Sequence, residues 1–152
     1  YYPVDGDHIV SLWIPLDAVS RETTVEFLAG SHRWGKWYQP KRFADAQTHQ
    51  DLEARFEQPP DVDSSRDQFT ILGWPLEPGD CLAFHGLTLH GAPGNASTDR
   101  RRAFSARFTG DNARFVLRDG FMSPPPPESG GPVVGAPMDS KAFPVIWWRV
   151  VQ

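Results

Sequence analysis

Short apolar runs and tight turns alternate in Leu76-Glu77-Pro78-Gly79-Asp80-Cys81-Leu82-Ala83-Phe84-His85-Gly86-Leu87-Thr88-Leu89-His90-Gly91. The Pro-Gly step is typical of a tight turn, since proline presets one turn position and glycine readily adopts the next. The apolar residues on either side of Gly86 predict two strands, Cys81–Phe84 and Leu87–His90. Between them, His85-Gly86 predicts a bulge or bend, because glycine accepts unusual backbone angles and close neighbours.

The same alternation of strands and turns continues in both directions along the chain. Ile9–Leu16 is rich in β-branched and aromatic residues, which favours a well-buried strand. We predict further strands at Thr23–Leu28, Phe69–Trp74, Ala103–Thr109 and Ala113–Arg118, the last two forming a hairpin across Gly110-Asp111-Asn112. The 152 residues include 13 Gly and 15 Pro, too many for long helices. The sequence therefore predicts a mainly β sandwich or small barrel.

Two segments lack this strand pattern. Residues 33–68 are mostly polar with scattered aromatic side chains, which favours a long lid insertion that contains a short helix at Asp45–Phe56. Residues 119–152 form a Pro-rich tail, and we expect its apolar end, Phe143–Val151, to dock back onto the core. The length suits one domain that spans residues 1–152.

Composition excludes several classes of function. Fifteen Lys and Arg against nineteen Asp and Glu leave a formal net charge of −4, which argues against a nucleic-acid binder. The run Arg100-Arg101-Arg102 is local and is interpreted by default as a solvated turn. No apolar stretch approaches the roughly 20 residues that cross a membrane. The single cysteine, Cys81, excludes an internal disulfide and a multi-cysteine zinc site. We therefore expect a protein of a reducing, cytoplasmic compartment that neither binds nucleic acid nor spans a membrane.

Histidines near glycines are the first candidates for chemistry. His85 and His90 each precede a glycine, which lets another group approach the backbone closely. His8 and His32 flank strand ends beside turns, where a solvated or capping role is the ordinary interpretation. A lone histidine on a strand is more often a satisfied core residue than a ligand, so the next strand along the chain decides how these candidates are interpreted.

That next strand has one face suited to binding an anion. Period-2 alternation assigns that face to Arg101, Ala103, Ser105 and Arg107, and the opposite face to Arg102, Phe104, Ala106 and Phe108. A guanidinium matches a carboxylate bidentately and keeps its charge when partly buried. The first face can therefore hold a carboxylate inside a barrel, while the second is expected to be mainly aromatic packing.

Leu76–Gly91 followed by Arg101-Arg102-Ala103-Phe104-Ser105 resembles the phytanoyl-CoA dioxygenase family. Ile9–Asp17 followed by Phe27–His32 resembles the same family's earlier strands and its Pro-Gly-Ser-His turn, with Ala29 in place of proline. The resemblance covers roughly residues 1–109 in the right order. It implies a double-stranded β-helix, the jelly-roll or cupin-like barrel, and Fe(II)- and 2-oxoglutarate-dependent oxygenase chemistry.

The resemblance also implies roles for individual residues. The family holds iron with a His-x-Asp/Glu pair and a distal histidine, and the matching distal histidine is His90, with His85 as a supporting neighbour. Arg101 falls at the position that binds the far carboxylate of 2-oxoglutarate. Trp13 matches an aromatic position on the cosubstrate side of the barrel, and Ser105 could add a hydrogen bond from Arg101's face. The implied cofactors are Fe(II), 2-oxoglutarate and O₂.

Some aromatic and basic residues are candidates for substrate contact. Trp34, Trp37 and Tyr38 begin the lid and could close over a small organic substrate, although simple lid packing explains the two tryptophans as well. Arg107 could pair with an acidic group of the substrate or form a structural ion pair. The implied reaction hydroxylates a C–H bond of that substrate and releases succinate and CO₂.

A His-x-Asp pattern occurs once in the chain, at His49-Gln50-Asp51. We do not assign iron to it, because the family's pair precedes the strand that carries Trp13, whereas His49 lies in the lid. Tyr1–Val4 resembles the segment that comes after the family's pair, so the resemblance implies a pair just before Tyr1 and a domain truncated at its N-terminus. On this basis the 152 residues supply one iron ligand of three, and we expect this polypeptide to bind iron poorly.

Two alternative functions remain open. A cupin-like binding module would use the barrel without redox chemistry, and it would have no His-x-Asp pair. A 2-oxoglutarate-dependent halogenase would keep the cofactors but have a small residue in place of the acidic ligand, so that chloride can bind the iron. The identity of the residues in that pair therefore separates hydroxylase, halogenase and binding module.

Overall fold

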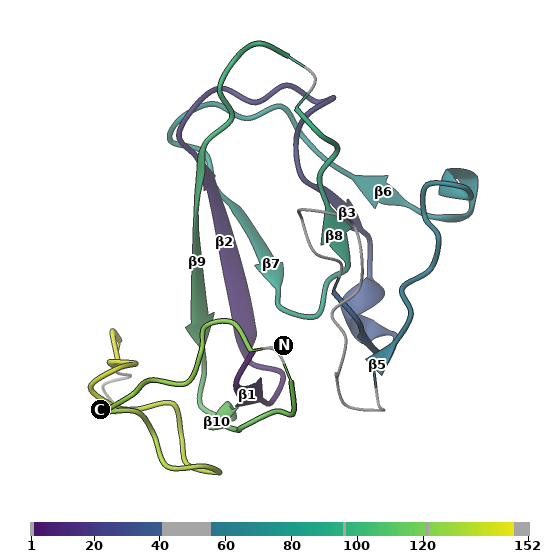
Figure 1. The fold of residues 1–152 in the computed structure, drawn as a ribbon. Coiled ribbons are helices and arrows are strands. Elements are labelled where there is room, and N and C mark those ends of the chain that lie inside the picture. Colours follow the sequence, from purple (N-terminus) through teal and green to yellow (C-terminus); the bar gives the residue numbers. More distant parts are fainter. Residues whose placement is uncertain (1, 41–55, 96, 121, 148–152) are drawn as a thin grey trace, which may run out of the picture. The chain divides into compact units, whose positions relative to one another are not determined.

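The computed structural model describes residues 2–40, 56–95, 97–120 and 122–147 (Figure 1). Strands dominate these residues, and their only helices are the short 3-10 turns η1 (Ser31–Arg33) and η2 (Arg66–Gln68). This confirms the prediction of a mainly β protein, although the described strands form no closed barrel. No helix among them is long and apolar enough to cross a membrane.

Contacts divide the chain into two compact units. The first unit comprises Tyr1–His8, Tyr38–Gln58 and Thr109–Gln152, and the second comprises Ile9–Trp37 and Pro59–Phe108. Every described residue with a predicted functional role belongs to the second unit, apart from Tyr38 in the lid.

The second unit contains a three-stranded sheet in the order β7-β2-β9 (Figure 1). These strands are β2 (Ile9–Pro15), β7 (Leu82–His85) and β9 (Ala103–Thr109). β2 pairs antiparallel with β7, with Trp13 opposite Leu82 and Ser11 opposite Phe84. Gly86 follows β7 where a Cβ atom would lie 2.8 Å from Cγ2 of Ile9, so a larger residue would collide there. The predicted bend after His85 therefore has a steric cause.

The second sheet of this unit has the order β6-β3-β8. Its strands are β3 (Glu26–Leu28), β6 (Ile71–Leu72) and β8 (His90–Gly91), all shorter than predicted. β3 is antiparallel to both neighbours, with Phe27 opposite Leu72 on one side and His90 on the other. The core of the unit is formed by buried side chains of Ile9, Val19, Val25, Phe27, Leu28 and Leu76.

A buried serine joins the turn after β3 to the chain before β8. The Ser31 hydroxyl donates to the carbonyl of Leu28 at 2.8 Å and accepts from the amide of Leu89 at 2.9 Å. Both bonds are made inside the protein, since Ser31 is only 2% exposed. The Gly-Ser-His turn is thus anchored against the strand that carries His90.

The first unit contains a two-stranded sheet of β1 (Val4–Asp5) and β10 (Arg114–Phe115), with Val4 opposite Phe115. The predicted hairpin of β9 with residues 113–118 is therefore wrong, since β10 pairs with β1 instead. Asn112 explains the change: its side-chain oxygen accepts from the amide of His8 at 3.0 Å, and its amide group donates to Asp7. These bonds draw the turn toward residues 7–8 rather than letting it close a hairpin.

The predicted lid and tail contain little regular structure in their described parts. β4 (Trp37–Tyr38) pairs with β5 (Phe56–Glu57), so Phe56 is in a strand, and the rest of the predicted helix lies outside the described residues. The described end of the tail, residues 143–147, does not dock as expected, since Ile146 and Trp147 are 71% and 74% exposed. Proline at 144 lacks an amide hydrogen, which disfavours pairing of this segment with a sheet.

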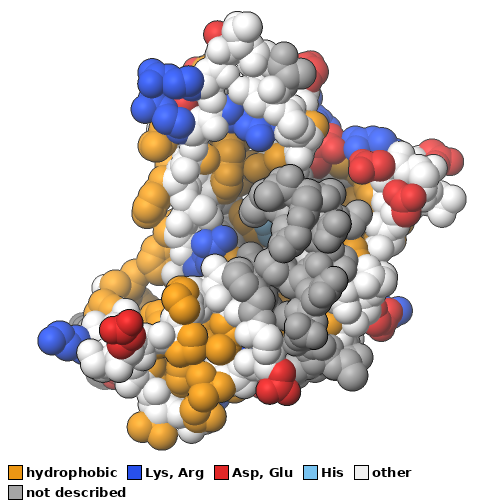
Figure 2. Space-filling view, in the orientation of Figure 1, with side chains coloured by type: hydrophobic (Ala, Val, Ile, Leu, Met, Phe, Trp, Pro, Cys, Tyr) orange, Lys and Arg blue, Asp and Glu red, His pale blue; other side chains and the backbone are white. Residues whose placement is uncertain are grey.

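The aromatic face of β9 is more exposed than predicted. Phe104 is 56% exposed and Phe108 is 36% exposed, and hydrophobic side chains are visible along the part of the surface where β9 runs (Figure 2). β9 lies at the edge of its sheet, and the described residues do not cover this face. The predicted aromatic packing is therefore not formed by these residues.

The arginine run before β9 is not a solvated turn throughout. Arg102 forms a bidentate ion pair with Asp17, in which its Nε and Nη2 donate to the two carboxylate oxygens at 3.0 and 2.8 Å. The Arg102 amide adds a bond of 2.9 Å to the same carboxylate, and these hydrogen bonds lower the pKa of Asp17 to about 2. The pair fastens the chain after β2 to the start of β9.

We expect Asp17→Asn to lower the melting temperature at pH 7. A carboxylate whose pKa falls from an ordinary value of 3.8 to about 2 on folding stabilises the fold above pH 4, and this contribution disappears as the pH falls through 2. Thermal unfolding is measured for wild type and variant at several pH values. The difference between their melting temperatures should become smaller below pH 4. Asp63→Asn is the control, because Asp63 is 97% exposed and 3.9 Å from its partner. A difference in melting temperature that does not depend on pH would contradict the prediction.

Candidate functional site

His90 lies on β8 between aromatic rings from both sheets of the second unit. Its ring centroid is 6.0 Å from that of Phe27 on β3 and 4.8 Å from that of Phe84 on β7. The residue as a whole is solvent-exposed, while its ring packs against these two neighbours. The distal histidine predicted from the sequence therefore lies where the two sheets approach each other.

A backbone bond determines which nitrogen of His90 is available to a metal. Nδ1 of the ring lies 2.8 Å from the carbonyl of Thr88, an acceptor, so Nδ1 carries the proton in this contact. In the neutral tautomer that remains, Nε2 has a free lone pair, the arrangement common in metal-binding histidines. Desolvation lowers the pKa of His90, the charge of Arg107 adds to the effect, and the Thr88 bond opposes it. The ring thus stays neutral at lower pH than a free imidazole.

Arg107→Met is expected to raise the pKa of His90, because the variant removes a positive charge that disfavours the imidazolium. The measurement is an NMR pH titration of the histidine ring protons, with the His90 signal assigned from His90→Gln. Arg100→Met is the matched control and should leave the His90 titration unchanged. An unchanged midpoint in Arg107→Met would show that this guanidinium does not act on His90.

Arg101 lies just before β9 and holds two backbone segments together. Its Nη1 donates to the carbonyl of Thr23 and, at 3.0 Å, to that of Pro93. Within the described part of the chain, Nη2 and Nε have no hydrogen-bond partner, so one edge of the guanidinium is available. Pro93 follows His90 closely, so the bond ties this arginine to the loop after the candidate metal ligand. The geometry is compatible with both a structural role and a carboxylate on the open edge.

The other predicted site residues contact residues of the second unit. Trp13 is half-buried on β2 opposite Leu82. The Ser105 hydroxyl donates to the carbonyl of Leu12 at 3.2 Å. Trp34, which follows η1, is 39% exposed, and its ring is 6.4 Å from that of Phe69. These contacts leave the cosubstrate and substrate roles of the three residues as predictions.

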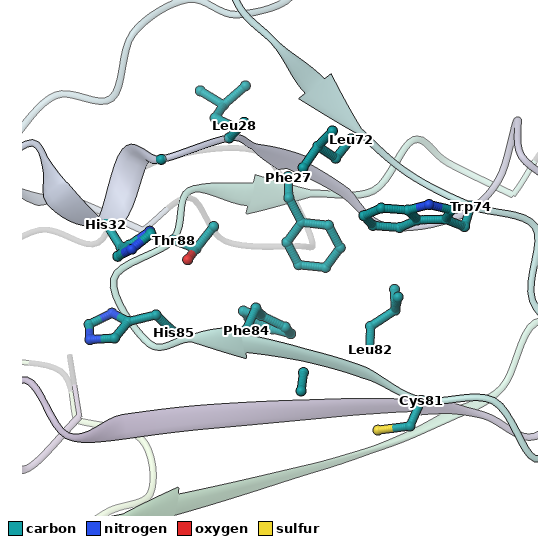
Figure 3. Close-up of a pocket in the computed structure, with 13 residues that line it drawn as sticks. Phe27, Leu28, His32, Leu72, Trp74, Cys81, Leu82, Phe84, His85 and Thr88 are labelled. Atoms are coloured by element: carbon teal, nitrogen blue, oxygen red, sulfur yellow. The ribbon is translucent and has the colours of Figure 1, made fainter.

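The second unit also contains a cavity of about 460 Å³ (Figure 3). Phe27 and Phe84, which flank His90, also line the cavity. Its other walls are formed by Leu28, Ala29, Gly30, His32, Leu72, Trp74, Cys81, Leu82, Ala83, His85 and Thr88. Trp74 and Leu72 were not predicted as site residues.

The described residues contain no cluster of three His, Cys, Asp or Glu side chains that could hold a metal by itself. His90 is therefore the one predicted ligand for which the structure gives a position. His49-Gln50-Asp51 lies outside the described residues. The imidazole lone pair of His90 fits a borderline metal such as iron, and a complete site would need ligands beyond the described ranges.

A family model for phytanoyl-CoA dioxygenase (PhyH) matches residues 1–103, more than half of the chain. The chain belongs to the PhyH family. This confirms the resemblance seen in the sequence, and the match includes β2, β3 and β8 with His90 as well as Arg101. Iron and 2-oxoglutarate, the cofactors implied by that resemblance, are the cofactors of this PhyH family.

Solved structures add a likeness of fold to this PhyH-family chain. One is the non-heme alpha ketoglutarate dependent epimerase SnoN from nogalamycin biosynthesis, with a TM-score of 0.59 and 21% identity. Another is SnoN in complex with Fe3+, alpha ketoglutarate and nogalamycin RO, with a TM-score of 0.61 and 23% identity. Each match covers 94% of this chain and 52% of SnoN, so the chain spans about half of that protein's length. No curated protein sequence matches the chain.

Proposed function

We propose that this protein is an Fe(II)- and 2-oxoglutarate-dependent oxygenase that hydroxylates a C–H bond of a small organic substrate. The observation that carries the proposal is the PhyH match over residues 1–103, which includes both His90 and Arg101. In this reaction O₂ and 2-oxoglutarate yield succinate and CO₂, and one oxygen atom enters the substrate. We further propose that the two sheets of the second unit belong to a double-stranded β-helix, which the likeness to SnoN supports.

The roles of this chain's residues follow from their contacts. Nε2 of His90 would bind iron, since the Thr88 carbonyl holds the proton on Nδ1. The open edge of Arg101 would hold the far carboxylate of 2-oxoglutarate, because Nη1 is already bonded to the backbone. Bound iron supplies the activation of O₂, and the protein's part is to orient the cosubstrate and limit water. Two further iron ligands would come from outside the described residues.

The test is formation of succinate from 2-oxoglutarate by the purified full-length protein under air, with and without Fe(II). Residues 1–152 alone should form little succinate, because the resemblance gives them one iron ligand of three. We expect succinate only when iron is present, and we expect His49→Gln and Asp51→Asn to retain it. Loss of succinate in those two variants would assign iron to His49-Gln50-Asp51. Absence of succinate from wild type with bound iron would favour the cupin-like binding module.

Epimerisation is a second candidate, because both similar structures are of an enzyme named an epimerase. An epimerase inverts a carbon centre without adding oxygen. Of the four electrons taken up by O₂, two then come from 2-oxoglutarate, and the other two must come from an added reductant such as ascorbate. Mass spectrometry of the product separates the candidates, since hydroxylation adds one oxygen and epimerisation leaves the mass unchanged. A halogenase would instead require chloride and add one chlorine.

A further inference from the structure

The cavity of the second unit has one polar end and one apolar end (Figure 3). At the polar end the rings of His32 and His85 lie 5.3 Å apart, centroid to centroid. Thr88 faces the same end, with its hydroxyl oxygen on the side of the two histidines. Toward the other end the cavity passes between Phe27 and Leu82 and reaches Trp74.

The apolar part of the cavity has a wall made of two aromatic rings in contact with each other. Phe27 comes from β3, Phe84 comes from β7, and their centroids are 4.8 Å apart. Trp74 follows β6 and stays 45% exposed although it lines the cavity. A large aromatic surface left partly open in a concave site marks a position that a ligand can cover. Such walls favour the binding of flat ring systems, because aromatic rings attract each other in stacked or tilted arrangements.

The polar end supplies hydrogen-bonding groups of a defined kind. No described residue forms a hydrogen bond with the Thr88 hydroxyl or the His32 ring, and the Thr88 backbone carbonyl is already used by His90. A threonine hydroxyl and an imidazole can both donate and accept, and neither requires a charged partner. They suit an alcohol, phenol or carbonyl group better than a phosphate, since none of the lining residues is Lys or Arg.

We propose that this cavity binds a ring-containing apolar molecule that ends in a hydroxyl or carbonyl group. The ring body lies between Phe27 and Leu82 and reaches Trp74, and the polar group meets Thr88 and His32. The volume of about 460 Å³ is within the range of small-molecule sites and admits a molecule of several fused rings. Binding does not depend on the proposed function; only the naming of this molecule as the substrate rests on that function.

The experiment uses two probes that differ by one hydroxyl, 2-naphthol and naphthalene. Their dissociation constants are measured by ligand-observed NMR on the protein without added iron or 2-oxoglutarate. We expect 2-naphthol to bind at about 0.1–1 mM, as its size allows. Naphthalene should bind about fivefold more weakly, because it lacks the hydrogen-bonding group. Failure of both probes to bind would overturn the proposal.

Three variants locate the probe. Trp74→Ala should weaken binding of both probes about tenfold, through loss of the stacking surface. Thr88→Val keeps the side-chain shape and should weaken only 2-naphthol, about fivefold. Trp147→Ala is the matched control, since this exposed tryptophan does not line the cavity, and it should change neither constant. Equal affinity of Thr88→Val and wild type for 2-naphthol would refute the proposed contact between the ligand's hydroxyl group and Thr88.

The outcomes also separate this proposal from the proposed function. The probe affinities could change in the three variants as expected while iron-loaded wild type forms no succinate. That outcome would support the ring-binding cavity and reject the oxygenase. Iron-dependent succinate formation with no probe binding would retain the oxygenase and reject the ring-binding cavity. Each proposal can therefore fail alone.

Discussion

Replacing Arg118 with alanine is expected to lower the free energy of unfolding of the first unit by about 3–5 kcal/mol. The Arg118 side chain is only 1% exposed and donates to the carbonyls of Tyr2 and Val4, both at 2.6 Å, and to Oδ1 of Asp5 at 2.9 Å. Its removal leaves carbonyls in a buried position without their donors, and unsatisfied buried groups are costly. No local pattern in the chain indicates this role, because the partners are more than a hundred residues away.

Hydrogen exchange at the Val116 amide measures this loss directly. That amide donates to the carbonyl of Pro3 at 3.1 Å, beside the pairing of β1 with β10. A loss of about 3 kcal/mol would speed its exchange about a hundredfold if the first unit opens as one cooperative element. Lys141→Ala is the control and should change the exchange little, since it removes a positive charge from an exposed position of the same unit. An Arg118→Ala variant that exchanges like wild type would contradict the prediction.

Arg101→Ala is expected to weaken binding of 2-oxoglutarate by about 30- to 1000-fold, because the variant removes the charged partner of the far carboxylate. Calorimetry on the full-length protein under anaerobic conditions with Fe(II) gives the affinity. The variant also loses the bonds from Nη1 to the carbonyls of Thr23 and Pro93, so a structural effect must be separated from a binding effect.

A matched cosubstrate achieves this separation. 2-Oxovalerate has the length of 2-oxoglutarate and the same keto acid but lacks the far carboxylate. Wild type should prefer 2-oxoglutarate strongly, and Arg101→Ala should bind the two acids about equally. A general structural defect would weaken both acids and preserve the preference. If the preference disappears in Arg100→Ala and survives in Arg101→Ala, the assignment is wrong.

The strands were predicted best where the sequence has a strong local pattern. β9 has the predicted bounds, Ala103–Thr109, and β2 ends one residue before its prediction, because alternation and β-branched residues act within the strand itself. β3 and β8 are shorter than expected, since only part of each segment finds a pairing partner. The hairpin after β9 failed because Asn112 bonds to residues that are distant in the sequence.

The candidate site, too, was predicted only in part from the sequence. The order of the motifs identified the PhyH family and, with it, His90 and Arg101 as the residues to test. The tautomer of His90 depends on Thr88, two residues away, yet the desolvation of its ring depends on Phe27 and Phe84 from other strands. No spacing rule predicts those neighbours, because strand pairing brings them together.

By itself, then, the sequence determined the mainly β class, the family and the identity of the candidate metal and cosubstrate residues. These depend on local backbone preferences and on motif order, both of which are properties of neighbouring residues. Only the tertiary structure decided that Arg102 pairs with Asp17 across 85 residues, that Arg118 is buried, and that Trp74 lines a cavity with Thr88. Each of these depends on which segments meet in space, and burial and hydrogen bonding between distant segments leave no periodic signal in the chain.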